Sequence, residues 1–189
     1  MVNLNRIIFA LTGFSFVASS VAQECFDESV YLTTPMKEFI VHDNGTVSHL
    51  ETGLMWKQCL QGKSGVQCDD GDALLVNWQG AFTELKAVNQ QGFAGYSDWR
   101  LPNTKELSSI IEFGCHDPAL NIKAFPNMES VRVWSSTPVA NLFALDSTKD
   151  LYSDHRSWFA SYDEGEVTFL NHADRTSQQH AVHLVRGAQ

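Results

Sequence analysis

The chain has 189 residues and a formal net charge of −9, with 22 acidic and 13 basic side chains. This length predicts one domain with a substantial core. The acidic balance argues against a nucleic-acid-binding function, which needs basic side chains to contact phosphates.

The first 22 residues have the pattern of a secretory signal peptide. Arg6 supplies the positive charge, an apolar run covers residues 7–18, and Ser20 and Ala22 place small residues before a cleavage site at Gln23. The apolar run is shorter than the roughly 20 residues that span a bilayer, so we expect cleavage rather than anchoring. Residues 23–189 are therefore predicted to form a single exported domain without a membrane span, in the periplasm, on the cell surface or secreted.

Four cysteines follow this leader, namely Cys25, Cys59, Cys68 and Cys115. An even number of cysteines in an exported chain favours two disulfides, for which three connectivities exist. The segment between Cys59 and Cys68 contains two glycines that let a short loop fold back. We therefore expect Cys59 to pair with Cys68, and Cys25 with Cys115. A zinc site is the alternative, but the sequence lacks Cys-x-x-Cys spacing.

The mature chain is predicted to begin with three short strands, at residues 39–42, 46–50 and 54–57. The turns between them fall at residues 43–45, which contain Asn-Gly, and at Thr52-Gly53. An amphipathic helix should follow, because apolar side chains recur at helical spacing in Trp78, Ala81, Phe82, Leu85 and Val88. Asn77 is suited to cap the start of this helix, and Gly92 lies just beyond its end.

Residues 95–107 combine a glycine turn, an Asp-Trp-Arg triplet, a proline and a helix start. Asn103 with Glu106 three residues later resembles a capping box. The second helix should end at Gly114, with a core-facing side formed by Leu107, Ile110, Ile111 and Phe113. We expect Trp99 in the core, and Asp98 and Arg100 in hydrogen bonds with the loop backbone. The alternative is that Trp99 or Arg100 binds a ligand, because both suit sugars and carboxylates.

The last third of the chain is predicted to contain strands again. One strand should cover residues 131–137 and include Trp134. A hairpin should join residues 158–162 to 167–170, and a last strand should cover residues 181–186. Residues 141–157 are polar and aperiodic, which is typical of a long surface loop. The order of strands, helices and strands predicts an α+β fold.

Two patterns are weak candidates for chemistry. Asp69, Asp70 and Asp72 could supply oxygen ligands to calcium, but they lack the EF-hand spacing, so a solvated loop is the preferred interpretation. Ser135 lies in a Trp-Ser-Ser-Thr segment without the Gly-x-Ser-x-Gly elbow of many serine hydrolases. We predict no enzyme activity and no cofactor, and calcium remains an alternative.

Seven segments in this order resemble the Lcl C-terminal domain family, which occurs at the C-terminus of the Legionella collagen-like adhesin. They are residues 44–47, 52–59, 78–81, 95–107, 125–126, 133–137 and 184–187. The resemblance implies a C-type-lectin-like fold related to formylglycine-generating enzymes. It also indicates that one set of residues is a structural motif of the fold: Asp98, Trp99, Arg100, Asn103, Glu106, Trp134 and Arg186.

The resemblance further implies adhesin-like binding, since the Lcl domain binds sulfated polysaccharides. This chain departs from the pattern in lacking a Gly-x-y region, in being acidic, and in having Leu101 before Pro102-Asn103 where a lectin calcium loop has Glu or Gln. We predict an exported binding domain for a glycan or an envelope protein, with specificity in residues 141–157. The alternatives are a structural or assembly subunit of an envelope or pilus complex, and a formylglycine-generating-type enzyme, which would need free thiols.

Overall fold

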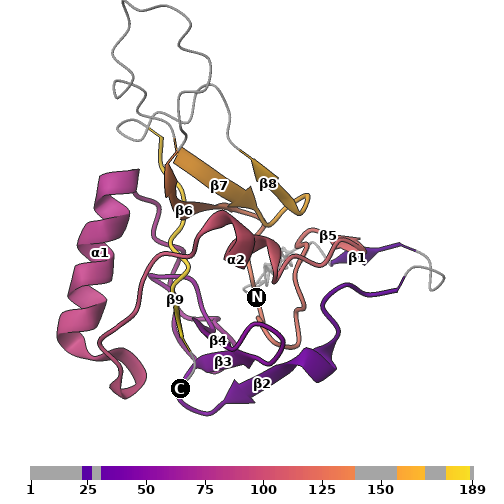
Figure 1. The fold of residues 1–189 in the computed structure, drawn as a ribbon, viewed down its shortest axis with the longest axis horizontal. Coiled ribbons are helices and arrows are strands. Elements are labelled where there is room, and N and C mark those ends of the chain that lie inside the picture. Colours follow the sequence, from indigo (N-terminus) through magenta and orange to yellow (C-terminus); the bar gives the residue numbers. More distant parts are fainter. Residues whose placement is uncertain (1–22, 27–30, 139–156, 169–177, 188–189) are drawn as a thin grey trace, which may run out of the picture.

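The computed structural model describes residues 23–26, 31–138, 157–168 and 178–187. These residues form two α-helices, two 3₁₀ helices and three antiparallel sheets, which confirms the predicted α+β class. In Figure 1 the two larger sheets lie on opposite sides of α2 (Thr104–Ser108), and α1 (Trp78–Gln91) runs along one flank. The expected signal peptide, and all of the expected loop 141–157 except Ser157, lie outside the described residues.

The largest sheet has the strand order β2-β3-β4-β9. Its first three strands, β2 (Phe39–His42), β3 (Thr46–His49) and β4 (Leu54–Lys57), form the predicted meander. The last strand, β9 (Val185–Gly187), is shorter than predicted. Upstream of β9, the carbonyls of Val182 and Leu184 accept hydrogen bonds from the chain at and beyond the end of β4, so these residues do not join a regular ladder.

The second sheet contains β6 (Arg132–Pro138), β7 (Ser157–Ser161) and β8 (Glu166–Thr168), and the hairpin of β7 and β8 confirms the one predicted. A third sheet pairs β1 (Glu24–Cys25) with β5 (Cys115–His116), and neither strand was predicted.

Both predicted disulfides are confirmed. Cys25 and Cys115 lie opposite each other in the β1–β5 pair and are bonded there. Cys59 and Cys68 close a short loop. Gly62 inside this loop has φ of 93°, and a Cβ at that position would lie 2.4 Å from the carbonyl oxygen of Asp72. The loop geometry therefore requires glycine at this position.

Helix α1 matches its sequence prediction closely. The Asn77 side chain accepts a hydrogen bond from the N–H of Gly80, and Gly92 ends the helix in the left-handed conformation. The apolar face of α1 packs, through Ala81 and Val88, into a core cluster that also contains Trp99 and Trp134. A second cluster is centred on Trp56 and Phe125, between the meander and the second sheet.

Helix α2 begins as predicted but is shorter. Asn103 and Glu106 form the capping box, yet the helix ends at Ser108 rather than at Gly114. Glu112 explains the early end, because its carboxylate accepts hydrogen bonds from the N–H groups of Thr33, Thr34 and Gly114 and so draws the chain towards the N-terminal segment. The predicted burial of Phe113 is wrong, since this side chain is 56% exposed.

No helix among the described residues has both the length and the apolar character needed to cross a bilayer.

Candidate functional site

The corner at residues 95–107 is built around Trp99, which is 2% exposed. The Asn89 side chain bonds both backbone groups of Trp99, accepting from its N–H at 2.9 Å and donating to its carbonyl at 2.8 Å. The indole N–H donates to the carbonyl of Phe93 at 3.1 Å. Trp99 therefore belongs to the core and is not available as a ligand platform.

The two charged neighbours of Trp99 bond mainly with side chains. The predicted bond to loop backbone is also present for Arg100, which donates to the carbonyl of Leu101 at 3.4 Å. Asp98 accepts two hydrogen bonds from Arg186, at 2.7 and 3.1 Å, and these hold the pKa of Asp98 below its usual value. Arg186 also stacks on Tyr96, with 3.8 Å between its guanidinium carbon and the ring centroid. Arg100 forms a second fork with Glu106, at 2.6 and 2.7 Å. Each of the two residues has a side chain of opposite charge within reach, Arg186 for Asp98 and Glu106 for Arg100. A bidentate ion pair is stronger than a single hydrogen bond to a carbonyl, so the side-chain partners dominate.

Of the other predicted residues, Trp134 belongs to the core, whereas the three aspartates lie on the surface. Trp134 is fully buried and donates through its indole to the carbonyl of Val76 at 2.8 Å. Asp69, Asp70 and Asp72 are exposed in the segment that follows the disulfide loop. Their carboxylates do not come together in a group of three that could hold a metal ion. Among the described residues, such a group occurs only elsewhere in the fold.

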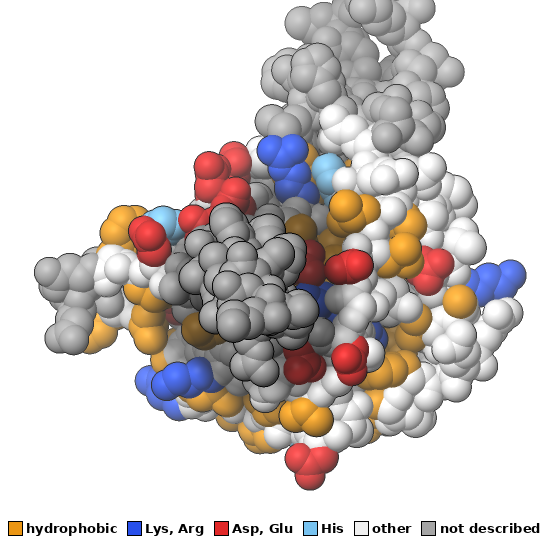
Figure 2. Space-filling view, turned by 180° about the vertical axis from the view of Figure 1, so that it is seen from behind, with side chains coloured by type: hydrophobic (Ala, Val, Ile, Leu, Met, Phe, Trp, Pro, Cys, Tyr) orange, Lys and Arg blue, Asp and Glu red, His pale blue; other side chains and the backbone are white. Residues whose placement is uncertain are grey.

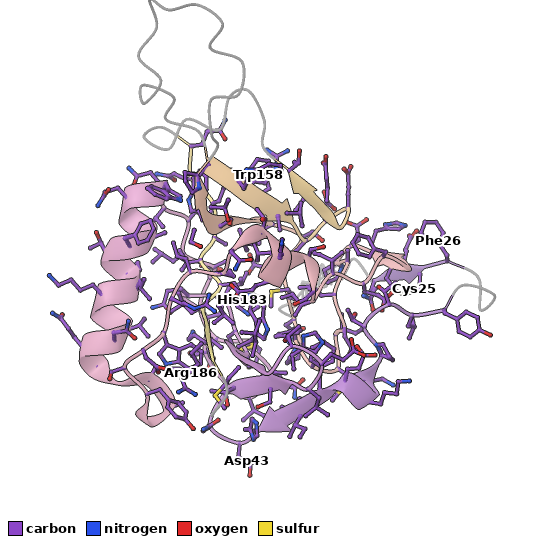
Figure 3. The ribbon with its side chains drawn as sticks, in the orientation of Figure 1. Cys25, Phe26, Asp43, Trp158, His183 and Arg186 are labelled. Carbon is purple, nitrogen blue, oxygen red and sulfur yellow. A yellow bond between two sulfur atoms is a disulfide. The ribbon has the colours of Figure 1, made fainter. Side chains whose placement is uncertain are left out.

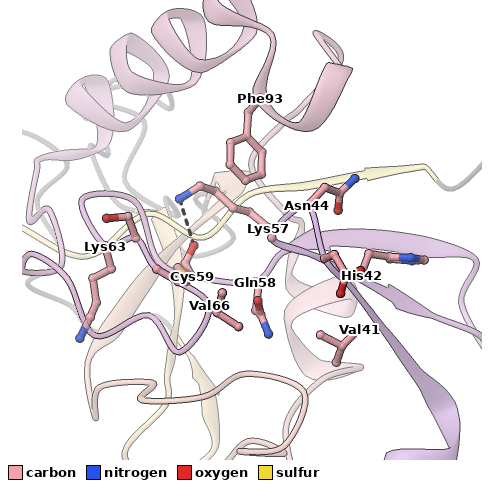
Figure 4. Close-up of a pocket in the computed structure, with 13 residues that line it drawn as sticks. Val41, His42, Asn44, Lys57, Gln58, Cys59, Lys63, Val66 and Phe93 are labelled. Carbon is pink, nitrogen blue, oxygen red and sulfur yellow. Dashed lines mark hydrogen bonds between the residues drawn. The ribbon is translucent and has the colours of Figure 1, made fainter.

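A pocket of about 580 Å³ lies between the β2–β3 turn, the end of β4, the disulfide loop and Phe93 (Figure 4). The turn is fixed to β4 by a hydrogen bond of 2.9 Å from the N–H of Gln58 to the carbonyl of Gly45. Phe93 enters from η2 (Phe93–Gly95), the 3₁₀ turn that follows α1. The β2–β3 turn, the segment from Lys57 to Val66 and Phe93 therefore meet at one concave surface.

Lys57 is the distinctive side chain of this pocket. It is only 7% exposed, and its ammonium group donates to the carbonyls of Cys59 and Leu60 at 3.3 and 3.4 Å. The same group lies 5.2 Å from the centroid of the Phe93 ring. Among the described residues no carboxylate forms an ion pair with it. Burial lowers the pKa of Lys57 to about 8.

The other walls of the pocket are partly apolar and partly polar. Figure 4 shows Phe93 and Lys57 on one side, with Val41, Gln58 and Val66 opposite. Val41 and Val66 are exposed, whereas Gln58 is buried and donates to the carbonyl of Ala124 at 3.3 Å. An aromatic ring, aliphatic surface and a desolvated cation together suit a ligand with an apolar face and a negative group.

Sequence reasoning did not identify this pocket. Its only local signal was a lysine at the end of a short strand that is otherwise apolar, followed by a cysteine two residues later. Phe93 lies outside the predicted helix, and its proximity to Lys57 depends on how α1 packs on the meander.

One comparison with known proteins identifies a family for this chain. The family model described as the Lcl C-terminal domain matches residues 45–186, from the turn before β3 into β9. No curated protein matches this sequence. The family match covers most of the chain, including the corner around Trp99 and most of the pocket around Lys57. The chain belongs to the Lcl C-terminal domain family.

Proposed function

We propose that this chain is an exported, non-enzymatic domain that binds carbohydrate in the pocket between Lys57, Phe93 and Val66. The observation that carries the proposal is the ammonium group of Lys57, buried beside the Phe93 ring and without an ion-pair partner among the described residues. A charged group is costly to bury without a counter-ion, so a perturbed lysine in a cleft is typical of a binding site. The adhesin-like family supports the same role, and the proposal includes a C-type-lectin-like arrangement of the fold.

The chemistry of the pocket favours a sugar that carries one carboxylate, such as a uronic acid. The ring of Phe93 offers an apolar face for the sugar, and Lys57 offers a cation for its acid group. Long-range electrostatics disfavour a heavily sulfated chain, because the net charge is −9 and Figure 2 shows acidic side chains distributed over the face opposite that of Figure 1.

The cysteines support both export and the absence of catalysis in this proposal. Two disulfides are typical of an oxidising compartment, which here would be the periplasm, the cell surface or the medium. The same two bonds use all four cysteines of the chain, so the free thiols required by formylglycine-generating chemistry are missing.

An assembly subunit of an envelope complex is a second candidate. The edge strand β2 exposes Ile40 and Val41, and an open strand edge can pair with another chain. Light scattering on the purified mature chain separates the two proposals, since an assembly subunit should self-associate or co-purify with envelope proteins.

A glycan array with the mature chain, followed by titration of the best oligosaccharide, tests carbohydrate binding. We expect acidic oligosaccharides to bind with and without calcium. Lys57→Met and Val66→Asp should weaken that binding by about tenfold or more, because one removes the cation and the other adds a repelling carboxylate at an exposed position. Lys37→Met, an exposed lysine outside the pocket, is the matched control and should bind normally.

Phe93→Ala gives a second test, with Phe113→Ala as the control at an exposed phenylalanine. Because Phe93 also contacts Trp99, circular dichroism must first show a folded domain. An array without any bound glycan, or pocket variants that bind like the controls, would refute the proposal.

A further inference from the structure

A second cluster of ligand-type side chains lies at the other end of the β2–β3 hairpin, away from the pocket. Glu38 ends the 3₁₀ helix η1 (Met36–Glu38), His49 ends β3, and Glu51 lies in the turn before β4. Backbone pairing fixes their proximity, because Phe39 is opposite His49 in the sheet and the N–H of Leu50 donates to the carbonyl of Glu38 at 2.8 Å.

The three side chains bring atoms that can ligate a metal close together. One atom from each, an imidazole nitrogen and two carboxylate oxygens, lie within 4.8 Å of one another. The distance from His49 Nε2 to Glu38 Oε2 is 3.8 Å, which is too long for a hydrogen bond. The Glu51 side chain is exposed, whereas His49 is buried and Glu38 is partly buried.

His49 provides an independent observation that points to a missing ligand. The side chain is 2% exposed, and its Nε2 atom has no hydrogen-bond partner among the residues that the structure describes. A buried polar atom without a partner is costly and uncommon in native structures. The unpartnered nitrogen lies 3.8 Å from a carboxylate oxygen of Glu38.

The rest of the His49 ring is held as expected for a ligating histidine. Its Nδ1 atom bonds the Thr52 hydroxyl at 3.0 Å, and the ring stacks on Phe39 with 4.8 Å between centroids. A hydrogen bond at one ring nitrogen orients the other towards a metal. Burial lowers the pKa of His49, and the neighbouring carboxylates of Glu38 and Glu51 act in the opposite direction.

We propose that Glu38, His49 and Glu51 form a binding site for a divalent transition-metal ion of the zinc type. Imidazole nitrogen with two carboxylates suits Zn²⁺, and it does not suit Ca²⁺ or Mg²⁺, which take oxygen ligands. Three protein ligands leave a fourth position for water. The ion would join η1, β3 and the β3–β4 turn. The site is separate from Asp69, Asp70 and Asp72, for which the sequence left calcium as a weaker alternative to a solvated loop.

Isothermal titration of the chelator-treated mature chain with ZnCl₂ tests this site. We expect one equivalent of Zn²⁺ to bind and to raise the melting temperature. Glu38→Gln and Glu51→Gln keep the shape of each side chain and should preserve the fold. Because even outer-shell substitutions weaken metal binding about tenfold or more, loss of a direct ligand should cost at least that.

His116→Asn is the matched control. His116 and Glu24 form a similar pair at 3.6 Å, but both are well exposed, so this pair tests adventitious surface binding. The control variant should bind Zn²⁺ like the wild type, and the ¹⁵N resonance of His49 Nε2 should shift on binding. Absence of zinc binding, unchanged affinity in both glutamate variants, or loss of binding in His116→Asn would each overturn the proposal.

Discussion

Lys57 combines two properties that rarely occur together in a side chain without a function. It is almost fully buried, and its hydrogen bonds to two carbonyls are long. Neither contact supplies the negative charge that would offset desolvation of an ammonium group. We therefore expect the lysine to reduce the stability of the free domain, and a bound anion to recover that cost.

The cost can be measured with Lys57→Met. Burial lowers the pKa of Lys57 from 10.5 to about 8, so the unfolded chain holds more protons between these values and stability of the wild type rises with pH there. The full pKa shift corresponds to about 3 kcal/mol of unfolding free energy. The variant gains this amount but loses the two hydrogen bonds of the lysine, which offsets part of the gain. We expect Lys57→Met to raise the free energy of unfolding at pH 7 by about 1–2 kcal/mol.

Urea unfolding of both proteins at pH 7 and pH 10 checks this expectation. The difference between variant and wild type should be largest at pH 7 and should shrink towards pH 10, where the wild-type lysine is mostly neutral. A variant that is less stable at pH 7, with a difference independent of pH, would show that the ammonium group stabilises the free domain.

At the scale of elements, the corner before α2 couples helix capping to an ion pair. Glu106 accepts from the N–H of Asn103 at 2.8 Å, and the same carboxylate receives both hydrogen bonds from Arg100. A helix of five residues has few internal hydrogen bonds of its own, so its start depends on these side chains. The cap also fixes the carboxylate that Arg100 binds.

A double-mutant cycle on Asn103 and Glu106 tests that coupling. Asn103→Ala should lower the free energy of unfolding by about 1 kcal/mol, the usual cost of an N-cap. Combined with Glu106→Ala, the loss should differ from the sum of the single losses by at least about 0.5 kcal/mol, as is typical of residues in one network. Asn77→Ala, which removes the cap of α1, is the distant control and should add to Glu106→Ala. Additive losses at the corner would contradict the coupling.

At this scale, the sequence predicts those features that depend on residues close together in the chain. The Asn-Gly turn, the caps at Asn77 and Asn103 and the helical spacing of α1 act within a few residues, and all are present. The end of α2 could not be predicted, because Glu112 is held by Thr33 and Thr34, which are 79 and 78 residues away.

The pocket and the metal cluster were missed for the same physical reason. Each combines residues that only tertiary structure brings together. The sheet register places Phe39 opposite His49, whereas Phe93 reaches Lys57 from the turn after α1. A strand of two residues, as in β1, has no periodicity to detect. The disulfide pairing was predictable because the nine-residue separation of Cys59 and Cys68 is itself a local signal.

At the scale of the whole molecule, buried histidines join the layers of the core. His183 lies in the interior (Figure 3), where its ring bonds the Tyr162 hydroxyl and the carbonyl of Lys57, both at 2.7 Å. These contacts connect the last segment of the chain to β4 and to the residue that follows β7. His180 lies between Trp134 and Phe159, with 4.2 and 5.0 Å between ring centroids. Neither ring can take up a proton without placing a charge in the core.

Acid should therefore destabilise this domain above the range in which its carboxylates titrate. Burial lowers the pKa of His180 and His183 to about 4, so the unfolded chain binds more protons and stability falls as pH drops below 6.5. Each histidine should lower the free energy of unfolding by about 2 kcal/mol at pH 5 relative to pH 7.5. Urea unfolding at both pH values measures the loss, and His183→Gln should remove about half of it.

His116 is the exposed control, because its hydrogen bond to Asp117 raises the pKa of His116 and so favours the folded state in acid. His116→Asn should leave the acid loss as large as in the wild type or larger, and equal stability of the wild type at the two pH values would contradict the neutral state of the buried rings.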